Sequence, residues 1–545
     1  MQQKIITLLF VFLFVQLTWA QDDDEKELGT ETVTVTKAYT PTISDAFKIK
    51  STPNLNDSIA LQKKKIEYSI FSVPVASTFT PAKGAASKVK KVPPPILYNS
   101  YASAGGGNPA NLMAKFYTSR TIDRESGYTV GLSHNSSRGD FDEVVLDNAF
   151  SNSAIEGSYK KRDSDYDWGF DIGASHQLYH WYGTPENTFD VNPTFLVDLD
   201  QSRAKQNYYM AEVGAHINLE DAYFKGAEIK YRRFWDAVKS GENRIVFSPQ
   251  FEFPVADELF GLNFKVDYVN GSFENTSLSN TENNEGINYS HLQVGVNPTL
   301  TMLRDDLTLN LGLNIVYGLN GERSDSNFYV YPTVTASYRL LNEVAIAYGG
   351  IEGELVQNSY YGFVQDNPYV SPTLTIAPTD KKYDAYLGLR GQLFANLSYN
   401  VKAAYKAENG KPLFKLNPEN LSRNDEKLYN LSNSFELFTV DGITLGDDVR
   451  TFSVFGELNV DVNRNFTLGV NAEYFSYGTE TDNPAWNLPD LTGSLFLDYQ
   501  IGKKWYLGAN LFYVGERQDF SSEAVVNGVP NNFTVIDLDG YFDAN

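Results

Sequence analysis

The sequence predicts an all-β protein, a transmembrane antiparallel β-barrel of about 20 strands, from three observations. Long segments alternate between apolar and polar residues, and short polar turns alternate with long connections. Tyr and Phe are abundant, at 35 each, while Met is rare at 4. Alternation with period two is typical of strands with one apolar face, and about ten residues suffice for a tilted strand to cross a bilayer. The aromatic content fits the girdles of membrane barrels.

Residues 289–317 show the pattern most clearly, as two long arms around the turn 303–306. A soluble antiparallel sheet is the alternative, but its strands would typically run about five or six residues. Its polar face would also carry more charge than the Gln, Asn, Thr and Gly found here. We therefore expect lipid to contact the apolar face, which comprises Leu292, Val294, Val296, Leu300, Met302, Leu307, Leu309, Leu311, Leu313, Ile315 and Tyr317.

Residues 1–20 have the features of a secretory signal peptide. Lys4 supplies the positive region, residues 5–15 the apolar core, and residues 18–20 a cleavage site with a small final residue. The absence of cysteine excludes lipoprotein acylation, disulfides and thiolate metal sites. A signal peptide followed by membrane-length hairpins indicates the outer membrane of a Gram-negative-type cell. The net charge of −23 argues against nucleic acid as a partner.

Residues 21–95 differ from the rest of the chain and are expected to form a partly ordered periplasmic segment. The segment begins with four acidic residues, 22–25, becomes rich in lysine near residues 63–65 and 88–91, and ends at the three prolines 93–95. Solvated charge is the simplest interpretation of the lysines, and contact with a partner protein or an anionic lipid headgroup is the alternative.

Residues 96–545 form the predicted barrel. Nine short turns imply eighteen strands, and a first strand near 96–105 and a last near 533–545 bring the total to about 20. Outer-membrane barrels place short turns in the periplasm and long loops outside. The short turns are 123–125, 162–165, 220–221, 257–258, 303–306, 342–343, 394–396, 462–465 and 502–504, and the long connections include 184–206, 273–286, 357–381 and 408–448.

The sequence stops in the middle of an expected strand, at residues 542–545, without the terminal aromatic residue that usually closes an outer-membrane barrel. One more turn and two more strands would give about 22, an even number with both ends in the periplasm. We therefore expect that the sequence lacks its last strands.

Two stretches resemble the TonB-dependent receptors. Residues 535–545 are similar to the strand that precedes the last hairpin of such receptors, whose known barrel size matches the inferred 22 strands. A second stretch resembles the TonB box, which in that family pairs as a strand with the energy-transducing protein TonB. It comprises Glu31, Thr32, Val33, Thr34, Val35 and Thr36, for which a simple periplasmic strand or linker is the alternative.

The chain departs from that family between the box and the barrel. A complete receptor carries a globular plug of well over a hundred residues there, whereas residues 21–95 are shorter and lack a glycine-rich plug motif. Large barrels are normally filled. We therefore expect one of three ways of filling the barrel. Either the N-terminal segment folds into the lumen, or the long loops fold inward, or another protein fills the barrel.

No residue pattern predicts catalysis, a metal site or a cofactor. His176 and His180 would be roughly 13 Å apart on a strand, too far to share a metal ion, and are expected at a strand end among interfacial aromatics. Gly-x-Ser-x-Gly, His-Glu-x-x-His and phosphate-loop motifs are absent. We therefore expect that the protein is not an enzyme.

Two functions remain open. The first is an outer-membrane barrel of the TonB-dependent receptor type that transports an unidentified substrate. The second is a non-transporting subunit or scaffold of an envelope complex, with residues 21–95 as a docking arm. The lumen separates the two, because a transporter needs converging polar and aromatic groups and a movable obstruction. The inward-facing charges predicted here are Lys265, Asp267, Glu457 and Asp461.

Overall fold

A computed structural model describes residues 98–108, 110–139, 147–180, 205–220, 222–273, 286–372, 374–416, 435–438, 448–480, 483–502, 504–522, 525–526, 529–530 and 533–544. The chain separates into two units, Met1–Val92 and Pro93–Asn545, and the described residues belong to the second. The expected signal peptide, the segment 21–95 and the TonB-box-like residues lie outside the described ranges.

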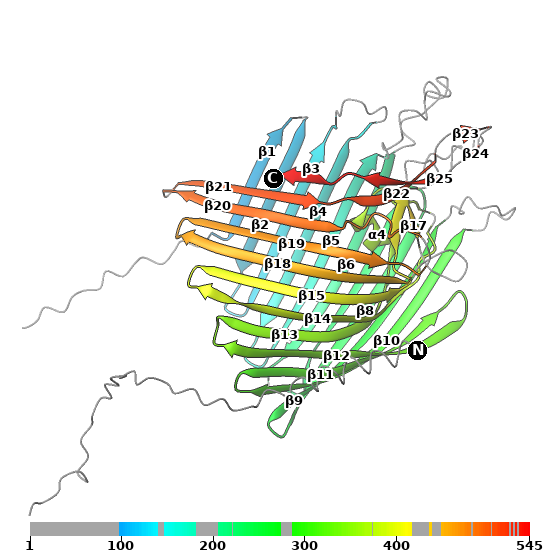
Figure 1. Ribbon diagram of the computed structural model, residues 1–545. Coiled ribbons are helices and arrows are strands. Elements are labelled where there is room, and N and C mark those ends of the chain that lie inside the picture. The colour runs from blue at the N-terminus through cyan, green and yellow to red at the C-terminus, as the bar shows by residue number, and fades with distance from the viewer. Residues whose placement is uncertain are drawn as a thin grey trace, which may run out of the picture. The chain divides into compact units, whose positions relative to one another are not determined.

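Twenty strands form one antiparallel sheet in which each strand pairs with the next along the chain (Figure 1). This number confirms the prediction of about 20. The strands are β1 Ser100–Gly107, β2 Asn111–Thr121, β3 Ser126–Ser137, β4 Phe150–Arg162, β5 Tyr166–His180, β6 Lys205–Leu219, β7 Phe224–Asp236, β8 Gly241–Val255, β9 Glu258–Phe273, β10 Ile287–Arg304, β11 Leu307–Asn320, β12 Asp325–Leu341, β13 Ala345–Val356, β14 Thr379–Phe394, β15 Leu397–Asn409, β18 Val449–Asn463, β19 Phe466–Gly478, β20 Leu491–Ile501, β21 Trp505–Val514 and β26 Tyr541–Ala544.

The remaining elements lie in the connections between these strands. They are the helix α4 Tyr360–Asp366 and the short strands β16 Leu413–Leu416, β17 Phe435–Phe438, β22 Arg517–Ser522, β23 Val525–Val526, β24 Val529–Pro530 and β25 Phe533–Leu538. Among the described residues, no helix is both long enough and apolar enough to cross a membrane.

The prediction of one continuous last strand over residues 533–545 is wrong in its extent. Residues 533–538 form β25, which pairs with β22 outside the main sheet, and only β26 joins the main sheet, against β21. Asp539 and Gly540 interrupt the strand. A Cβ at Gly540 would lie 2.9 Å from the Val514 carbonyl oxygen, so the backbone approaches β21 here as only glycine permits.

The nine predicted short turns all connect strands at one end of the sheet, from the β2–β3 turn to the β20–β21 turn. An antiparallel meander places every second connection at the same end. The opposite end carries the long connections, together with three short ones at 108–110, 237–240 and 321–324. The predicted sorting of turns and loops is confirmed for the nine short turns.

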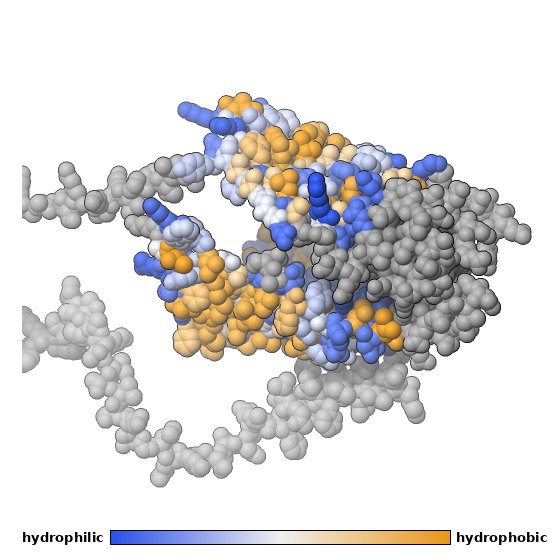
Figure 2. All heavy atoms as spheres, turned by 90° about the horizontal axis from the view of Figure 1, so that it is seen from above, coloured by the Kyte–Doolittle hydropathy of each residue, from blue (hydrophilic) through white to orange (hydrophobic). Residues whose placement is uncertain are grey.

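Strand pairing confirms the predicted faces of the 289–317 hairpin. Leu300 pairs with Leu311 and Thr301 with Asn310, so apolar and polar positions stay in separate rows across β10 and β11. Leu311 is 39% exposed on the outer face. The sheet curves around a hollow, and its outer surface carries apolar patches (Figure 2). This outer face includes Phe170, Ile172, Ile229, Phe264, Val294, Leu313, Val330, Leu387, Val401, Val454, Leu458, Leu495 and Leu507.

Candidate functional site

The connection between β13 and β14 buries several large apolar side chains, which is unusual for a surface loop. We call residues 357–372 and 374–378 the inward loop. Tyr360, Phe363, Val364, Leu374 and Ile376 of this loop are buried. They pack against side chains on the inner faces of strands β6, β7, β9 and β10, which are Tyr208, Phe234, Val269, Phe273 and Tyr289. The inward loop therefore lies against the inner wall at the end that carries the long connections.

Local sequence defines the helix at the centre of the inward loop. Ser359 is the N-cap, with extended backbone, and its hydroxyl accepts the Gly362 N–H at 3.1 Å. Asn367 ends α4, and its N–H donates to the Phe363 carbonyl at 2.8 Å. These caps satisfy backbone groups that the ends of this seven-residue helix would otherwise leave unpaired. It fixes Tyr360 at the first helical position, facing the barrel wall.

Two buried carboxyl groups of the wall hold Tyr360, and we call these three residues with Tyr289 the latch. The Tyr360 hydroxyl donates to Asp236 Oδ2 at 2.8 Å, and the Tyr360 N–H donates to Glu242 Oε2 at 2.6 Å. The Tyr289 hydroxyl donates to the same Glu242 oxygen at 2.7 Å. Asp236 is 5% exposed and Glu242 1% exposed. Such charge-assisted hydrogen bonds are roughly twice as strong as neutral ones.

The phenol of Tyr360 remains a donor over a wide pH range. Burial, reinforced by the negative charge of Asp236, raises the pKa of this phenol well above its ordinary value. Because the inward loop is not a strand of the sheet, this side chain reaches its partners from inside the lumen.

Arg232 on β7 contacts the neighbouring tyrosine of the loop. Its guanidinium carbon lies 3.9 Å from the centre of the Tyr361 ring, a cation–π contact. Its Nη2 is 3.9 Å from Glu242 Oε1, too far for a hydrogen bond. Arg232 Nε and Nη2 and Glu242 Oε1 are buried without a hydrogen-bond partner.

Further hydrogen bonds attach the remainder of the inward loop. The Tyr208 hydroxyl donates to the Pro368 carbonyl at 2.8 Å, and His291 Nε2 donates to the Ile376 carbonyl at 2.8 Å. The Asn358 amide donates to the Ala377 carbonyl at 2.7 Å. The loop is thus fixed at its beginning, middle and end.

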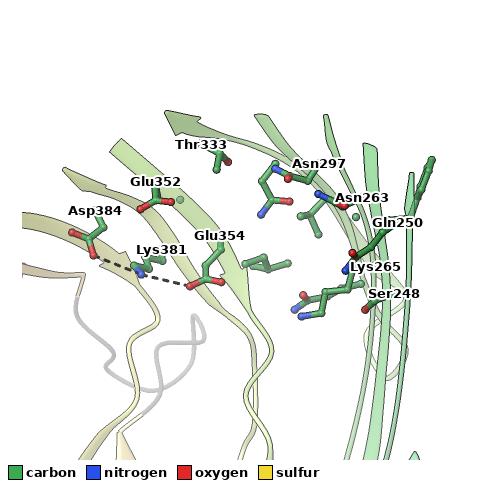
Figure 3. Close-up of a pocket in the computed structure, with 17 residues that line it drawn as sticks. Ser248, Gln250, Asn263, Lys265, Asn297, Thr333, Glu352, Glu354, Lys381 and Asp384 are labelled. Carbon is green, nitrogen blue, oxygen red and sulfur yellow. Dashed lines mark hydrogen bonds and ion pairs between the residues drawn. The ribbon is translucent and has the colours of Figure 1, made fainter. Parts of the chain in front are cut away.

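A polar cavity of about 470 Å³, which we call the chamber, lies along the inner faces of β8 to β14. Gln293 of its wall is two residues along β10 from His291, which binds the inward loop. Figure 3 shows acidic residues and Lys381 on one wall, facing amide residues and Lys265 on the other. The polar lining comprises Ser248, Gln250, Asn263, Lys265, Gln293, Asn297, Asn314, Thr333, Glu352, Glu354, Lys381 and Asp384.

A second cavity of about 250 Å³ shares Ser248 and Lys265 with the chamber. Asp267 is fully buried and accepts two hydrogen bonds from Arg244, at 2.8 and 2.7 Å, while Lys265 Nζ lies 3.1 Å away. The bidentate geometry compensates the desolvation of this carboxylate. The structure confirms the predicted inward position of Lys265 and Asp267.

Glu457 and Asp461 of β18 also lie on the face predicted for them, opposite the exposed Leu458 and Val462. Glu457 accepts a hydrogen bond from the Asn459 amide at 2.8 Å, and Asp461 accepts one from the Thr467 hydroxyl at 3.0 Å. The polar lumen expected from strand parity is present.

His176 and His180 lie near the end of β5 among aromatic rings, as predicted. His176 stacks on Tyr209 with ring centres 4.9 Å apart, and its Nε2 is 3.1 Å from Asn207 Oδ1. His180 is buried, with Nδ1 donating to the Ala149 carbonyl at 2.6 Å. In the described ranges, no group of three or more His, Cys, Asp or Glu residues is arranged to hold a metal ion.

The latch is the part of the site that sequence analysis missed. The sequence shows that the 357–381 connection is long, and inward folding of the long loops is one of the three predicted ways to fill the barrel. Neither Asp236 nor Glu242 stands out from the other acidic residues of the chain. A signal was present in the loop itself, because Tyr360, Phe363 and Ile376 are unusual in an exposed connection.

Comparison with known proteins gives structural matches alone, since no family model and no curated protein matches the chain. The siderophore receptor PirA from Acinetobacter baumannii aligns with a TM-score of 0.59 at 11% identity, over 82% of this chain and 72% of its own. A variant of the ferric enterobactin receptor PfeA from Pseudomonas aeruginosa gives 0.54 at 12%, over 82% and 71%.

The ferripyoverdine receptor of the outer membrane of Pseudomonas aeruginosa, bound to ferripyoverdine, gives a TM-score of 0.53 at 12% identity, over 82% of this chain and 64% of that one. At these identities the similarity lies in the fold. It extends over 82% of this chain, in agreement with the resemblance in the sequence. The described part of the chain is therefore a β-barrel with the fold of the TonB-dependent siderophore receptors.

Proposed function

We propose that this protein is an outer-membrane barrel of the receptor or transporter type whose lumen is obstructed by its own inward loop. The observation that carries the proposal is the latch, in which two buried carboxyl groups hold Tyr360 against the inner wall. Because the inward loop is not part of the main sheet, it can leave the wall and return without breaking strand pairing. A scaffold has no need of the polar chamber.

The location follows from the two faces of the sheet. Apolar side chains such as Leu311, Leu313 and Leu387 are exposed on the outer face, and burying them in lipid stabilises the barrel. Charged residues such as Lys265 and Asp267 point inward. The receptors of similar fold support an outer-membrane location for this chain. The proposal places the short turns and residues 21–95 in the periplasm, because outer-membrane barrels have their short turns there.

The same proposal includes a partner at the N-terminus. Residues 31–36 would pair as a strand with TonB or another periplasmic protein. Replacing Val33 and Val35 with proline should abolish cross-linking to TonB, because proline cannot donate to a strand ladder. Unchanged cross-linking in that variant would leave these residues as a linker.

Single-channel conductance in planar bilayers tests the proposed obstruction. Three proteins are compared: the full chain, a variant lacking residues 21–95, and a variant with residues 359–376 replaced by a short Gly/Ser linker. We expect a small current in the full chain and a clear increase when the inward loop is replaced.

The other outcomes contradict the proposal in different ways. An increase only on deleting residues 21–95 would make that segment the obstruction in place of the loop. Large current in all three proteins would mean an unobstructed pore. Silence in all three would favour the scaffold of an envelope complex. As a control, Gly/Ser residues in place of the exposed β11–β12 turn, residues 321–324 at the same end of the sheet, should leave the current unchanged.

A further inference from the structure

A histidine lies on the outer face of the sheet, on the side of the apolar residues. His134 is on β3, two residues from Leu132, and it pairs with Ser153 of β4. Leu132 and its own partner Ile155 are 44% and 50% exposed on that face. Alternate residues of a strand share a face, so His134, Ser136 and Ser153 point outward with them. Ionisable side chains within membrane-spanning segments are rare and generally mark a functional site.

The position of His134 along its strand places it near the membrane interface. It is three residues from the end of β3, on the side of the long connections. Ser153 pairs on its other side with His176, whose ring is stacked at 4.9 Å on Tyr209, and Tyr209 is stacked at 5.5 Å on Trp235. Outward-facing aromatic rows of this kind form the girdle at the level of the lipid headgroups. The ester groups of membrane lipids lie there, between the headgroups and the acyl chains.

His134 is hydrogen-bonded to two serines. Its Nε2 is 3.0 Å from Ser136 Oγ on the same strand, and its Nδ1 is 2.8 Å from Ser153 Oγ on the neighbouring strand. With the proton on Nδ1, the imidazole donates to Ser153, and Nε2 is free to take the proton of Ser136. All three side chains are partly exposed. A hydroxyl within hydrogen-bond distance of a base that a third group orients is the arrangement that activates serine for acyl transfer.

Ser136 is the better placed of the two serines to act as the nucleophile. Ser151 pairs directly with it across β3 and β4, and the Cβ atoms of such opposing residues are about 4.5–5.5 Å apart. The Ser151 hydroxyl can therefore donate to an oxyanion that forms at Ser136. Ser136 is also two residues nearer than His134 to the strand end, where water reaches the membrane surface. Ser153 is enclosed between His134 and His176.

We propose that Ser136, His134 and Ser153 form an esterase site that cleaves acyl esters of outer-membrane lipids. Ser136 Oγ bonds to the carbonyl carbon of the ester while its proton passes to His134 Nε2. The bond from that carbon to the alcohol oxygen then breaks, and the alcohol leaves with the proton. Water attacks the acyl group on Ser136 by the same route, which releases the fatty acid and restores the Ser136 hydroxyl. Ser153 is the positioning residue.

The orientation of the site selects a lipid as the substrate. A soluble ester would meet a site in the lumen, whereas Ser136 faces the bilayer, whose lipids carry the ester at this level. The activity goes beyond the proposed transport and does not involve the inward loop. The motifs searched for in the sequence do not mark this site, because Ser153 lies 19 residues from His134 and joins it only through strand pairing.

Two measurements on the full chain in detergent test the proposal. The first is labelling with a fluorophosphonate, which reacts with activated serines, followed by mass spectrometry of the peptides. We expect the adduct on Ser136 and its absence in His134→Gln. The second is release of oleate from dioleoylphosphatidylethanolamine in mixed micelles. Ser136→Ala and His134→Gln should each lower the rate of release at least about 100-fold.

Further variants separate positioning from folding. Ser153→Ala should lower kcat with little change in KM, and Ser153→Thr, which keeps the hydroxyl, should restore most of the rate. Ser133→Ala is the matched control, because Ser133 is adjacent to His134 but lies on the inner face, and it should leave the rate unchanged. Heat-modified electrophoretic mobility checks that each variant keeps the folded barrel.

Several results would overturn the proposal. Neither an adduct nor oleate release would mean that the three residues only satisfy one another's hydrogen bonds. Release that persists in Ser136→Ala would come from another source. An adduct on Ser153 would refute the roles assigned to the two serines, and hydrolysis of p-nitrophenyl acetate without hydrolysis of the phospholipid would refute the lipid substrate. The conductance measurements address the inward loop, so the transporter assignment stands or falls separately.

Discussion

Removing one hydroxyl should loosen the inward loop measurably. In Tyr360→Phe the ring still packs against Phe234 and Phe273, but the donor 2.8 Å from Asp236 Oδ2 is lost. Asp236 keeps a longer hydrogen bond from Gln206 to the same oxygen, at 3.3 Å. Loss of a hydrogen bond to a charged group costs about 1.5–3 kcal/mol, which corresponds to roughly a 10- to 150-fold rise in the loop-opening equilibrium.

Hydrogen–deuterium exchange of peptides covering residues 359–370 measures this equilibrium, because locally opened segments exchange in proportion to their open population. Tyr361→Phe is a matched control, since Arg232 contacts the ring of Tyr361 and the ring is retained. Protection should fall at least tenfold in Tyr360→Phe and stay constant in Tyr361→Phe. Equal protection in Tyr360→Phe and the unmodified chain would refute the role of the latch.

Three further results are expected. Leu311→Arg should block stable membrane assembly at a cost of about 2–4 kcal/mol, whereas Asn310→Arg on the inner face should insert normally. Urea unfolding in liposomes compares the two variants. Normal insertion of Leu311→Arg would contradict the assignment of Leu311 to the lipid-facing side of β11. Phe363→Ala leaves a cavity in the buried cluster, so it should destabilise the closed loop by about 3–5 kcal/mol and raise the single-channel conductance. An unaltered current would argue against obstruction of the lumen by the inward loop. Because burial raises the pKa of Tyr360, the stabilisation of the closed loop by its phenol is fully present below the ordinary pKa of tyrosine, about 10, and is lost as the pH rises above it. Open probability should therefore rise above about pH 10, and the part due to this phenol should vanish in Tyr360→Phe.

Most of the barrel could be predicted because strands reveal themselves locally. The alternation of residues 289–317 fixed both faces of β10 and β11, and the pairing of Leu300 with Leu311 follows from the short turn between them. The nine short turns gave the strand number through the same local signal. The end of the chain was harder, because the Asp539–Gly540 break resembles an ordinary position of a continuous strand until β21 is seen against it.

The site could be predicted only in outline. Strand parity placed Lys265 and Asp267 on the inner face, but it could not show that Asp267 is fully buried by Arg244. It also could not show that Gln293 and Asp384 line one cavity, because they lie on strands separated by three others. The TonB-box-like residues 31–36 remain a prediction outside the described ranges.

The sequence by itself determined the barrel architecture, the approximate number of strands and the two faces of the long hairpins, because a strand repeats every two residues and a lipid environment selects apolar groups on alternate positions. Only the tertiary structure decided what occupies the lumen. Tyr360 meets Glu242 and Asp236 across 118 and 124 residues of chain. Such contacts depend on the curvature of the sheet and on the desolvation of the groups that meet. Neither quantity has a local signature in the sequence.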